Sequence, residues 1–488
     1  MKRNKRTLII LAAVAIVLVA AVLALLLPDQ LGGGGASSSV SSSSGSTLYE
    51  YPSKDLQSMQ VKNEKGAFTF VPDADATAKA QSEAAASAAS GASSAPAASV
   101  DTVFKVQELD GLPLNADAVA AAAKDGYVFA TVKTVTTTDQ LDSYGLADGN
   151  AAATLTCTFA DGTVKTLLIG GQTPLDATSY YVREKDSHVV YAANVDEALL
   201  GPAAAFVSTS VTNFTTSETG SSPFQQIALK NQNGSFTLSR SGDSADWTVD
   251  GMPANGDAVS TLSTGLAALT ADSVAALDPD SAALKTYGLQ SPAATAAMTL
   301  PDGSAHTLLI GGTDADGNYY AMLEGGRVVY TLASSGLSWL GQGAIDLRDL
   351  HILSNDVADI ASFKIEGSKP FDFAVTRTEN AASSTEDAKS YTYTAKVNGK
   401  DAADYNTYTA FFEKAAQLQI LEAAGSAKPS GDPAWTVTLA GYDSAVHHVY
   451  KFYPSGSRRY LVTVDGTAFG LMNVSDFDAL IESAGTVK

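Results

Sequence analysis

Alternation of apolar and polar residues recurs along this chain, and one long pattern occurs twice. Between residues 287 and 340 the sequence reads YGL, an alternating run on both sides of Asp302-Gly303, then LLIGG, YYAML and RVVY. From Tyr144 it reads YGL, an alternating run, TLLIGG, YYVRE and HVVY. A period of two is typical of strands with one buried face. Two matches of this length indicate a duplicated supersecondary unit.

Each copy is preceded by a hairpin and by a strand, a helix and a short strand. The hairpins are expected to turn at Lys65-Gly66 and at Asn233-Gly234, and asparagine-glycine is typical of tight hairpins. The strand, helix and short strand are expected at 103–106, 115–123 and 130–135, and again at 247–249, 255–268 and 272–276. The second helix carries one apolar stripe, formed by Val259, Leu262, Leu266 and Leu269. Such a stripe can bury one helix face on a sheet.

A third, divergent copy follows the same order of elements without YGL or IGG. It opens with IASFKIEGSKPFDFAVTR, contains a polar insertion at 379–389 and closes with an amphipathic stretch at 474–481. The sequence therefore predicts three repeat units at 48–209, 222–348 and 356–488. Inside the first unit, residues 74–100 are rich in alanine and serine, which indicates either a mobile low-complexity insertion or a weak helix.

The fold class predicted for these units is α+β. Hairpin signals outnumber helix signals and the strands alternate, so each unit should be a mostly antiparallel sheet with helices packed on one face. LLIGG stands where a strand is expected to end, and its glycine pair allows a positive φ or a close backbone approach. Replacing Gly311 with valine should therefore destabilise the second unit. The recurring structural motif comprises Tyr144, Gly145, Leu146, Gly170, Gly171, Tyr181, Tyr191, Tyr287, Gly288, Leu289, Gly311, Gly312, Tyr320 and Tyr330.

The amino-terminal end is predicted to be a membrane anchor. A basic cluster at 2–6 precedes an uncharged apolar run at 8–27. At about 1.5 Å per residue this run spans about 30 Å, the thickness of the hydrocarbon core. A cleaved signal peptide is the alternative, but its apolar region is usually shorter, about 7–15 residues. Residues 1–29 are thus expected to be a cytoplasmic basic end and transmembrane helix, and the Gly/Ser-rich residues 30–47 a flexible tether.

Location and charge narrow the classes of partner. The positive-inside rule places the basic end in the cytoplasm and the body outside, as a single-pass protein of the cell membrane. The net charge of −21 repels phosphate backbones, so nucleic-acid binding is not expected. One cysteine, Cys157, precludes an intramolecular disulfide and a multi-cysteine metal site.

In these residues the chain resembles a bacterial family known as domain of unknown function 4340. The resemblance rests on the anchor, on the order YGL, IGG, YY and VVY in both copies, and on a close at 345–349 that reads IDLRD. It covers most of the chain after the tether, the third unit by order of elements. It implies no catalytic residues. Some members are linked to ABC-transporter components of the gliding-motility auxiliary type, so the resemblance implies an accessory role beside a transporter.

Candidate chemical groups favour structural roles. Cys157 lies in ATLTCTF, where alternation turns it into the core with Leu155 and Phe159, and Met298 takes the same place in the second copy. The stretch GGTDADGNYY superficially resembles a calcium loop. However, an EF-hand needs glycine at its sixth position and glutamate at its twelfth, so a hairpin loop with Asp314 is predicted instead.

Other signatures of catalysis or metal binding do not emerge. His447 and His448 are adjacent on an expected strand, so they point to opposite faces and cannot readily bind one metal ion. The sequence contains no HExxH, GxSxG, SxxK, Walker A or GxGxxG motif. No catalytic, cofactor-binding or metal-binding residues are therefore predicted.

Two tyrosine pairs are the best ligand candidates, since aromatic rings on a sheet can stack on sugars or peptides. In Tyr180-Tyr181 and Tyr319-Tyr320, however, one ring of each pair should face the core and the other cover the sheet edge. The preferred hypothesis is thus a non-enzymatic extracytoplasmic scaffold or binding protein, with protein partners in an envelope or transporter complex and an unidentified small-molecule ligand, if any. The alternative is a cell-envelope hydrolase acting on glycan or peptide, with a carboxylate site between units.

Overall fold

The computed structural model describes residues 46–487, except 90–99, 175, 177, 215–221, 243–245, 382–383, 385–388 and 402–403. The predicted anchor at 1–29 and nearly all of the predicted tether at 30–47 lie outside these residues. Within the described ranges, none of the helices combines the length and the hydropathy needed to cross a bilayer.

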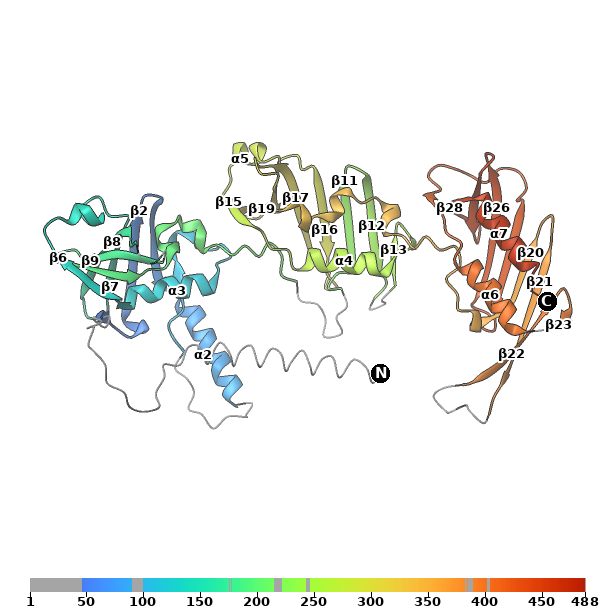
Figure 1. The fold of residues 1–488 in the computed structure, drawn as a ribbon, viewed down its shortest axis with the longest axis horizontal. Helices are drawn as coiled ribbons and strands as arrows, with labels where there is room; N and C mark the ends of the chain where they lie inside the picture. The colour runs from blue at the N-terminus through green and yellow to red at the C-terminus, as the bar shows by residue number, and fades with distance from the viewer. Residues whose placement is uncertain are drawn as a thin grey trace, which may run out of the picture.

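The described strands form three large antiparallel sheets and one small two-stranded sheet. Figure 1 shows the large sheets one after another along the long axis of the molecule, in the order of the chain. The first sheet runs β4 (Phe104–Val106), β3 (Gly66–Pro72), β2 (Leu56–Asn63), β7 (Ala153–Phe159), β8 (Val164–Gln172), β9 (Ser179–Glu184), β10 (Val189–Asn194) and β6 (Lys133–Thr137). The small sheet pairs β1 (Thr47–Glu50) with β5 (Val128–Ala130).

The second and third sheets repeat this strand order, each with one further short outer strand. The second runs β14 (Met252–Pro253), β13 (Trp247–Val249), β12 (Gly234–Arg240), β11 (Gln226–Asn231), β16 (Ala294–Thr299), β17 (Ala305–Thr313), β18 (Tyr319–Leu323), β19 (Val328–Leu332) and β15 (Ser273–Leu277). The third runs β23 (Lys400–Asp401), β22 (Tyr391–Val397), β21 (Phe371–Glu379), β20 (Ile360–Glu366), β25 (Trp435–Gly441), β26 (His447–Ser455), β27 (Arg459–Val464), β28 (Thr467–Asn473) and β24 (Glu422–Ala423).

The helices α3, α4 and α6 connect strands at corresponding places in the three sheets. The α-helices are α2 (Ala74–Ala89), α3 (Ala116–Tyr127), α4 (Gly256–Ala267), α5 (Ser281–Thr286), α6 (Tyr405–Ala416) and α7 (Val474–Ala484). Short 3-10 helices are η1 (Ser53–Asp55), η2 (Gln107–Leu109), η3 (Leu141–Tyr144), η4 (Glu197–Leu200), η5 (Ala203–Phe206), η6 (Ser334–Gly336), η7 (Ser338–Gly341), η8 (Ala344–Leu347) and η9 (Val357–Asp359). The predicted amphipathic close at 474–481 is α7.

The helices α3, α4 and α6 cover equivalent faces of the three sheets, which we call the helix faces. The side chains of Asn115 and Asn255 cap α3 and α4 by accepting the N–H of Ala118 at 3.1 Å and of Ala258 at 3.0 Å. The helices therefore begin just after the asparagines at which the sequence placed their start, since such a side chain satisfies a free N–H of the first turn. The predicted stripe of α4 is buried.

The buried apolar residues form two main clusters. One joins the helix faces of the first and second sheets, and the segment between these sheets contributes Val207 and Val211 to it. The other fills the third sheet and is contacted by Met252 and Leu350 from the chain before it. The apolar interior is thus continuous from the first sheet to the second, and the third core is closed partly by residues that precede it.

Two expectations about elements are corrected, and for a third the structure selects one of the two alternatives. Helices do not lie on one face only, because α5 and η3 lie opposite α4 and α3, against small clusters around Leu289 and Leu146. The short strand expected at 130–135 is divided between β5 and β6, which belong to different sheets. The alanine-rich insertion forms a helix, α2, as far as Ala89, and the rest of the insertion falls on residues outside the description.

Candidate functional site

The YGL and IGG motifs meet on the face opposite the helix face, which we call the loop face. In the second sheet the N–H of Gly312 donates to the carbonyl oxygen of Tyr287 at 2.8 Å. A Cβ atom at Gly311 would lie 2.1 Å from the same oxygen, and one at Gly170 would lie 2.2 Å from the oxygen of Tyr144. Packing therefore explains why the YGL and IGG motifs recur together in this chain, because only glycine lets the YGL turn approach the strand.

This geometry selects one of the two roles expected for the glycine pair. Gly170, Gly171, Gly311 and Gly312 all lack a positive φ, so the pair serves close backbone approach. The strand does not end there either, because β8 and β17 continue to Gln172 and Thr313 past a local irregularity in their pairing with β9 and β18. A positive φ occurs instead in the YGL turns, at Gly145 and Gly288.

The tyrosine pairs are placed partly as expected. Tyr180 and Tyr319 pack on the main core, whereas Tyr181 and Tyr320 point to the loop face. The ring of Tyr320 lies 4.6 Å from that of Tyr287, measured between centroids, and Tyr181 lies 4.9 Å from Tyr144. The second ring therefore does not cover a sheet edge, because β9 and β18 lie inside their sheets and the ring instead holds the YGL turn.

The third sheet shows what replaces this packing when the motif is absent. The pairs Ala153 with Ile169, Ala294 with Ile310 and Trp435 with Phe452 occupy the same register in the three sheets. Tyr453-Pro454 thus stands where the other sheets have the glycine pair. A ring and a proline at these positions leave no space for a YGL turn, so the absence of IGG from the third sheet explains why YGL is absent too.

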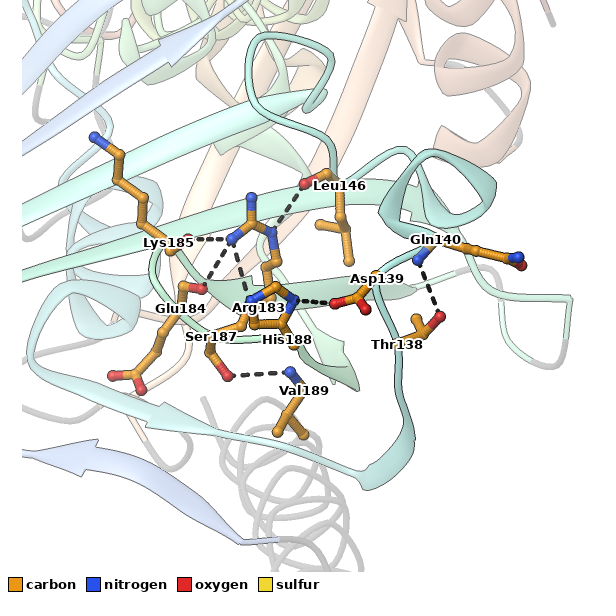
Figure 2. A network of polar contacts seen from close by, with 10 residues as sticks. All are labelled: Thr138, Asp139, Gln140, Leu146, Arg183, Glu184, Lys185, Ser187, His188 and Val189. Atoms are coloured by element: carbon orange, nitrogen blue, oxygen red, sulfur yellow. Dashed lines mark hydrogen bonds and ion pairs between the residues drawn. The ribbon is translucent and has the colours of Figure 1, made fainter.

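The first sheet adds a buried arginine to the YGL turn. Arg183, on β9, is 3% exposed, and its Nη2 forms an ion pair with Asp148 at 2.6 Å. As Figure 2 shows, its guanidinium also donates to backbone carbonyl oxygens of the turn and of the β9–β10 hairpin: Leu146 (2.9 Å), Glu184 (3.3 Å), Lys185 and Ser187 (3.4 Å). Buried guanidinium groups need such partners, and here they tie the YGL turn to the hairpin.

Sequence reasoning missed Arg183, although a signal existed. In YYVRE the arginine alternates with Tyr181, so it points to the same face as the loop-face ring. The second sheet has Met322 in the same register, opposite Leu309 where Arg183 lies opposite Leu168. The polar network is thus specific to the first sheet, and the equivalent position in the second is apolar packing.

The two junctions between the large sheets are built alike. Residues 207–211 form the first junction and residues 348–352 the second. Each forms one backbone bridge to the segment just before the helix of the preceding sheet and one to the segment just after the helix of the following sheet. Four backbone hydrogen bonds recur at equivalent positions. At the first junction they are Asn115 N–H to Phe206 O (2.9 Å), Ser208 to Pro113 (2.7 Å), Val211 to Leu269 (2.8 Å) and Ala271 to Thr209 (2.8 Å). At the second they are Asn255 to Leu347 (2.9 Å), Asp349 to Pro253 (2.9 Å), Ile352 to Leu418 (2.9 Å) and Ile420 to Leu350 (2.9 Å).

The chain enters the first sheet in the same manner. The N–H of Thr131 donates to the carbonyl oxygen of Ser46 at 2.9 Å, as Ala271 and Ile420 do at the junctions. Thr47 pairs with Ala130 in the small sheet. All three large sheets therefore receive the incoming segment on the residues that follow α3, α4 or α6.

One turn on the preceding sheet completes each junction. The turn sequences are Asp-Gly-Leu-Pro at 110–113 and Asp-Gly-Met-Pro at 250–253. Leu112 is buried in the cluster shared by the first two sheets, and Met252 packs on the core of the third. The equivalent turn of the third sheet, after β22, reads Asn-Gly-Lys-Asp at 398–401 and offers no apolar side chain. The turn therefore marks a sheet that is followed by another.

Arginine side chains lie at both junctions. At the first, Arg327 donates to the carbonyl oxygen of Asp110 on the preceding sheet at 2.9 Å and pairs with Asp278 at 2.6 Å. The hydrogen bond from Arg327 holds the pKa of Asp278 below its usual value. In the first sheet the same hairpin position carries His188, paired with Asp139 at 2.9 Å (Figure 2).

At the second junction, Arg348 is buried beside the third sheet. Its Nη2 donates to the carbonyl oxygen of Phe469 at 3.1 Å, and its guanidinium carbon lies 4.9 Å from the centre of that ring. Burial lowers the pKa of Arg348. Val207 occupies the equivalent place in the first junction, since it pairs with Leu114 as Arg348 pairs with Ala254. The two junctions thus share their backbone and differ in the side chains that secure them.

A cavity of about 380 Å³ opens at the first junction. It lies between the Asp-Gly-Leu-Pro turn, the linking segment and the β18–β19 hairpin, and its walls include Leu112, Val211, Leu323, Val328 and Tyr330. Burial raises the pKa of Tyr330. The donors of Arg327 at the rim are already bonded within the protein, and no carboxylate is among the described residues that line the cavity. The cavity can hold an apolar group, but it offers no acid–base pair for hydrolysis.

A family model described as Domain of unknown function (DUF4340) matches residues 105–250 and again residues 247–434, which is more than half of the chain. The chain belongs to the DUF4340 family. Each of the two matches runs across one junction, starting at β4 or β13 and including the first hairpin of the next sheet. Comparisons with curated proteins and with solved structures gave no match. The region that defines DUF4340 therefore includes the connection between sheets as well as the strands of one sheet.

The remaining candidates of this DUF4340 chain have structural surroundings. Cys157 is fully buried with Leu155, as predicted, and burial raises the pKa of its thiol to about 12, so the thiol is unreactive at neutral pH. Met298 is buried at the corresponding position. Asp314 lies in a hairpin loop, as predicted, where its carboxylate accepts the N–H groups of Asp316 and Asn318 at 2.9 and 2.8 Å.

The histidine pair of this family member lies on β26, as expected. His448 pairs with Asp465 at 2.8 Å, and His447 is exposed. In the part of the chain that the structure describes, no group of three or more histidine, cysteine, aspartate or glutamate residues is placed to hold a metal ion.

Proposed function

We propose that this protein is a membrane-anchored, extracytoplasmic scaffold of three tandem repeat units, which holds partner proteins of the cell envelope at a fixed spacing. The observation that carries the proposal is the identity of the two junctions: the same four backbone hydrogen bonds join the first sheet to the second and the second to the third. A flexible string of domains would not need bonds on both sides of each linking segment. Repeat arrays whose units contact their neighbours in this way present extended binding surfaces.

The division into units at 48–209, 222–348 and 356–488 is part of this proposal. It is supported by the common strand order of the three large sheets and by the equal register of their central strands. The third sheet also differs from the other two, because its turn at 398–401 is polar where the turns at the junctions carry an apolar third residue. Polar outer surfaces are typical of the units that cap a repeat array.

The location and the kind of partner rest on the amino-terminal sequence and on the family. The apolar run at 8–27 preceded by basic residues favours an anchored body outside the membrane. The link of some family members to ABC-transporter components favours a transporter or envelope complex as the setting. A net charge of −21 favours protein partners over nucleic acids.

A binding role is also favoured over hydrolysis of glycan or peptide. A glycosidase-type site needs two carboxyl groups that face one cleft. The junction cavity has apolar walls and a bonded arginine, and the carboxyl group with a strongly raised pKa, Asp125, belongs to a different place, beside the incoming strand of the first sheet. The proposal therefore assigns no turnover to this chain.

The proposed orientation can be tested with single cysteines, because the native Cys157 is buried and serves as an unreactive background. In intact cells a membrane-impermeant maleimide should label Ser37→Cys in the tether and leave Asn4→Cys at the basic end unlabelled. Permeabilised cells should label both. Labelling of Asn4→Cys but not Ser37→Cys in intact cells would contradict the proposed topology.

The scaffold role itself is tested by chemical cross-linking in membranes followed by purification in detergent. The full chain should yield the same discrete partners repeatedly, and variants that loosen a junction should lose the partners that contact both adjoining units. Steady hydrolysis of peptidoglycan fragments or envelope peptides by the purified chain, abolished by Asp125→Asn, would instead support the hydrolase.

A further inference from the structure

The cavity at the first junction takes its walls from the two sheets that meet there. Leu112 belongs to the turn of the first sheet, Val211 to the linking segment, and Leu323 and Tyr330 to the β18–β19 hairpin of the second sheet. Its volume of about 380 Å³ lies within the usual range of small-molecule sites, about 300–1,000 Å³. Such sites have mainly apolar walls and often lie between domains. The size and the position of this cavity therefore suit a small molecule.

The hairpin that lines the cavity differs from its counterpart in the first sheet. Both hairpins join their strands in the same register, so Leu323 corresponds to Glu184 and Gly325 to Asp186. The first sheet follows no other described sheet, and its hairpin is charged at these two positions. The second sheet follows the first, and its hairpin carries an apolar and a small residue there. The wall of the cavity is thus free of charge where the repeat elsewhere has two carboxylates.

The charged groups at the mouth of the cavity are neutralised within the protein. Nε and Nη2 of Arg327 donate to the two carboxylate oxygens of Asp278 at 2.6 and 2.9 Å, and Nη1 donates to the carbonyl oxygen of Asp110 at 2.9 Å. The carboxylate of Asp110 pairs with Lys105 at 2.7 Å. A charged ligand would therefore lose its hydration without gaining an ion pair, and such a loss is costly. This arrangement favours an uncharged ligand.

One polar group of the cavity wall is left for a ligand. Tyr330 is only 5% exposed, and its hydroxyl has no hydrogen-bond partner among the described residues. Ser210, also in the wall, already donates from Oγ to the carbonyl oxygen of Thr212 at 3.2 Å. Buried hydroxyl groups are normally bonded, and a buried water typically needs about three polar partners. A ligand with one acceptor would complete the hydroxyl better than a water held by this single group.

The second junction shows that the repeat does not require such a cavity. There Arg348, from the linking segment, lies over the ring of Phe469 on β28, which takes the place of β19 in the strand order. Its counterpart at the first junction is Val207, which is too short to cover a ring in this way. The chain itself therefore covers the receiving strand at the second junction and leaves space beside it at the first.

We infer that the first junction binds a compact, uncharged and mainly apolar small molecule, which lies between the two sheets and accepts a hydrogen bond from the hydroxyl of Tyr330. Leu112, Val211 and Val328 contact its apolar body. Because these walls belong to both sheets and to the segment between them, the bound molecule stabilises the junction. The inference does not depend on the anchor or on the scaffold function.

The test uses the full chain in detergent and benzophenone as the probe. Benzophenone is uncharged and has two apolar rings and one carbonyl oxygen. Near-ultraviolet light attaches its ketone carbon to a C–H group in contact with it, and mass spectrometry then locates the labelled residue. Labelling of the peptides that contain Leu112, Val211 or Leu323 should saturate as the probe concentration rises. Labelling of the apolar run at 8–27 by probe dissolved in micelles should rise without saturating.

Removal of one hydroxyl tests the hydrogen bond. In Tyr330→Phe the benzophenone concentration for half-maximal labelling should rise about threefold to tenfold, which corresponds to one net hydrogen bond. Diphenylmethane has the same rings without the oxygen, so it should compete equally well in the native chain and in the variant. Tyr191→Phe removes the corresponding hydroxyl of the first sheet and should change neither value. A purely structural role of Tyr330 would instead weaken both compounds.

A charged wall tests the preference for uncharged ligands. Leu323→Glu gives the second hairpin the residue that the first sheet has at Glu184, and labelling at the cavity should fall at least about tenfold because a carboxylate would have to be buried beside the probe. Should this variant fail to fold, 4-benzoylbenzoate tests the same point on the native chain. This anionic analogue should not compete at concentrations at which benzophenone saturates.

Four results would overturn the inference. One is the absence of saturable labelling at the cavity peptides. Another is competition by 4-benzoylbenzoate equal to that of benzophenone, which would exclude selection against charge. The third is an equal loss of benzophenone and diphenylmethane in Tyr330→Phe, which would exclude the hydrogen bond. The fourth is stronger competition by a monoacylglycerol, which would assign the cavity to the acyl chain of a lipid.

Discussion

Asp125, near the end of α3, shows how a single carboxyl group is tied to the way the chain enters the first sheet. Its backbone carbonyl oxygen accepts the hydroxyl of Tyr49, on β1, at 2.9 Å. Its Oδ2 accepts the N–H of Asp196 at 3.2 Å. Loss of solvent raises the pKa of Asp125 to about 7, since that hydrogen bond only partly offsets the cost of burying a charge.

The raised pKa makes the stability of the first unit depend on pH. In the unfolded chain an aspartate titrates near 3.9, so the native state holds the proton more tightly. The stabilisation is complete below about pH 4 and is lost as the pH rises to about 7. Between about pH 4 and about pH 7 the free energy of unfolding of the native chain should decrease as the pH rises. In Asp125→Asn this decrease should be smaller, by up to about 1.4 kcal/mol per pH unit. Urea unfolding at a series of pH values measures this.

Asp186→Asn, on the exposed tip of the β9–β10 hairpin, is the matched control and should leave the slope unchanged. Equal slopes for the native chain and Asp125→Asn would show that the carboxyl group keeps an ordinary pKa in the folded state.

At this scale the sequence predicts residues whose place follows from alternation alone. Cys157 and Met298 could be assigned to the core because each lies in a regular run of alternating residues. Arg183 and Asp125 could not, because a charged residue in a strand or helix normally points to solvent, and the partners that allow burial come from distant segments. Leu146 and Asp148 lie 37 and 35 positions from Arg183.

Among the elements, the YGL turn packs on β17, and this packing explains why the YGL and IGG motifs occur together. The turn ends α5 with a positive φ at Gly288 and places the carbonyl oxygen of Tyr287 over the strand. Tyr320 and Leu289 then cover the loop face of the sheet. This second layer is small, but it seals the side of the sheet that α4 leaves open.

The glycine pair provides a matched test of this docking. Gly311→Ala should destabilise the second unit by about 1–3 kcal/mol, as overpacking does, because its Cβ would lie 2.1 Å from the oxygen of Tyr287. Gly312→Ala should be tolerated, since its Cβ would lie 3.8 Å from the same atom. Valine at Gly311 should cost more than alanine.

The measurement is urea unfolding followed by the fluorescence of Trp247 and Trp339, with Trp435→Phe in all variants to silence the third sheet. Equal midpoints for the two alanine variants would mean that the turn moves away from the strand without cost, and the packing explanation of IGG would fail.

Elements were predictable where local signals agree. Asparagine caps, the apolar stripe of α4 and the hairpin of β11 and β12 all combine turn chemistry with periodicity, although this hairpin turns at Gln232-Asn233, one residue before the predicted position. The face on which α5 lies was not predictable, because a helix of one or two turns carries too few apolar residues to show which side is buried. The continuation of β8 and β17 past their glycines was missed because strand ends are set by pairing, which glycine weakens without preventing.

In the whole molecule, the junctions decide whether the three large sheets act as one body. Each linking segment is bonded to the sheets on both sides, and the first two cores are continuous. The second junction relies more on a single side chain, because Arg348 is buried against Phe469 and its Nε has no hydrogen-bond partner in the described structure.

Arg348→Ala should therefore loosen the second junction without unfolding either unit. Spin labels at Ser304→Cys in the second unit and Ser457→Cys in the third should give a narrow distance distribution in the native background and a clearly broader one in the variant. The buried Cys157 is not labelled. Arg459→Ala, which removes a half-buried arginine that lies 3.7 Å from Glu422 and also bonds Asn473 within the third sheet, is the control and should keep the narrow distribution. A broad distribution already in the native background would refute a rigid junction.

The arrangement of the sheets could not be predicted from the sequence patterns, because backbone hydrogen bonds at a junction do not require particular side chains. One signal was present and unused: the turns Asp-Gly-Leu-Pro and Asp-Gly-Met-Pro precede the two helices that each have a further sheet after them. Their apolar third residue makes sense only as a contact to the next sheet.

That turn also gives the molecule a direction of growth. A further copy of residues 208–348 placed after residue 348 would bring its own receiving surface and its own Asp-Gly-Met-Pro turn, and would extend the body by one step. A copy appended after the carboxyl end would face the turn at 398–401, which has lysine and aspartate in place of methionine and proline. Without an apolar side chain from that turn, the added copy would not be fixed to the third sheet. A further sheet would therefore be received firmly inside this array, and not after the third sheet as it now stands.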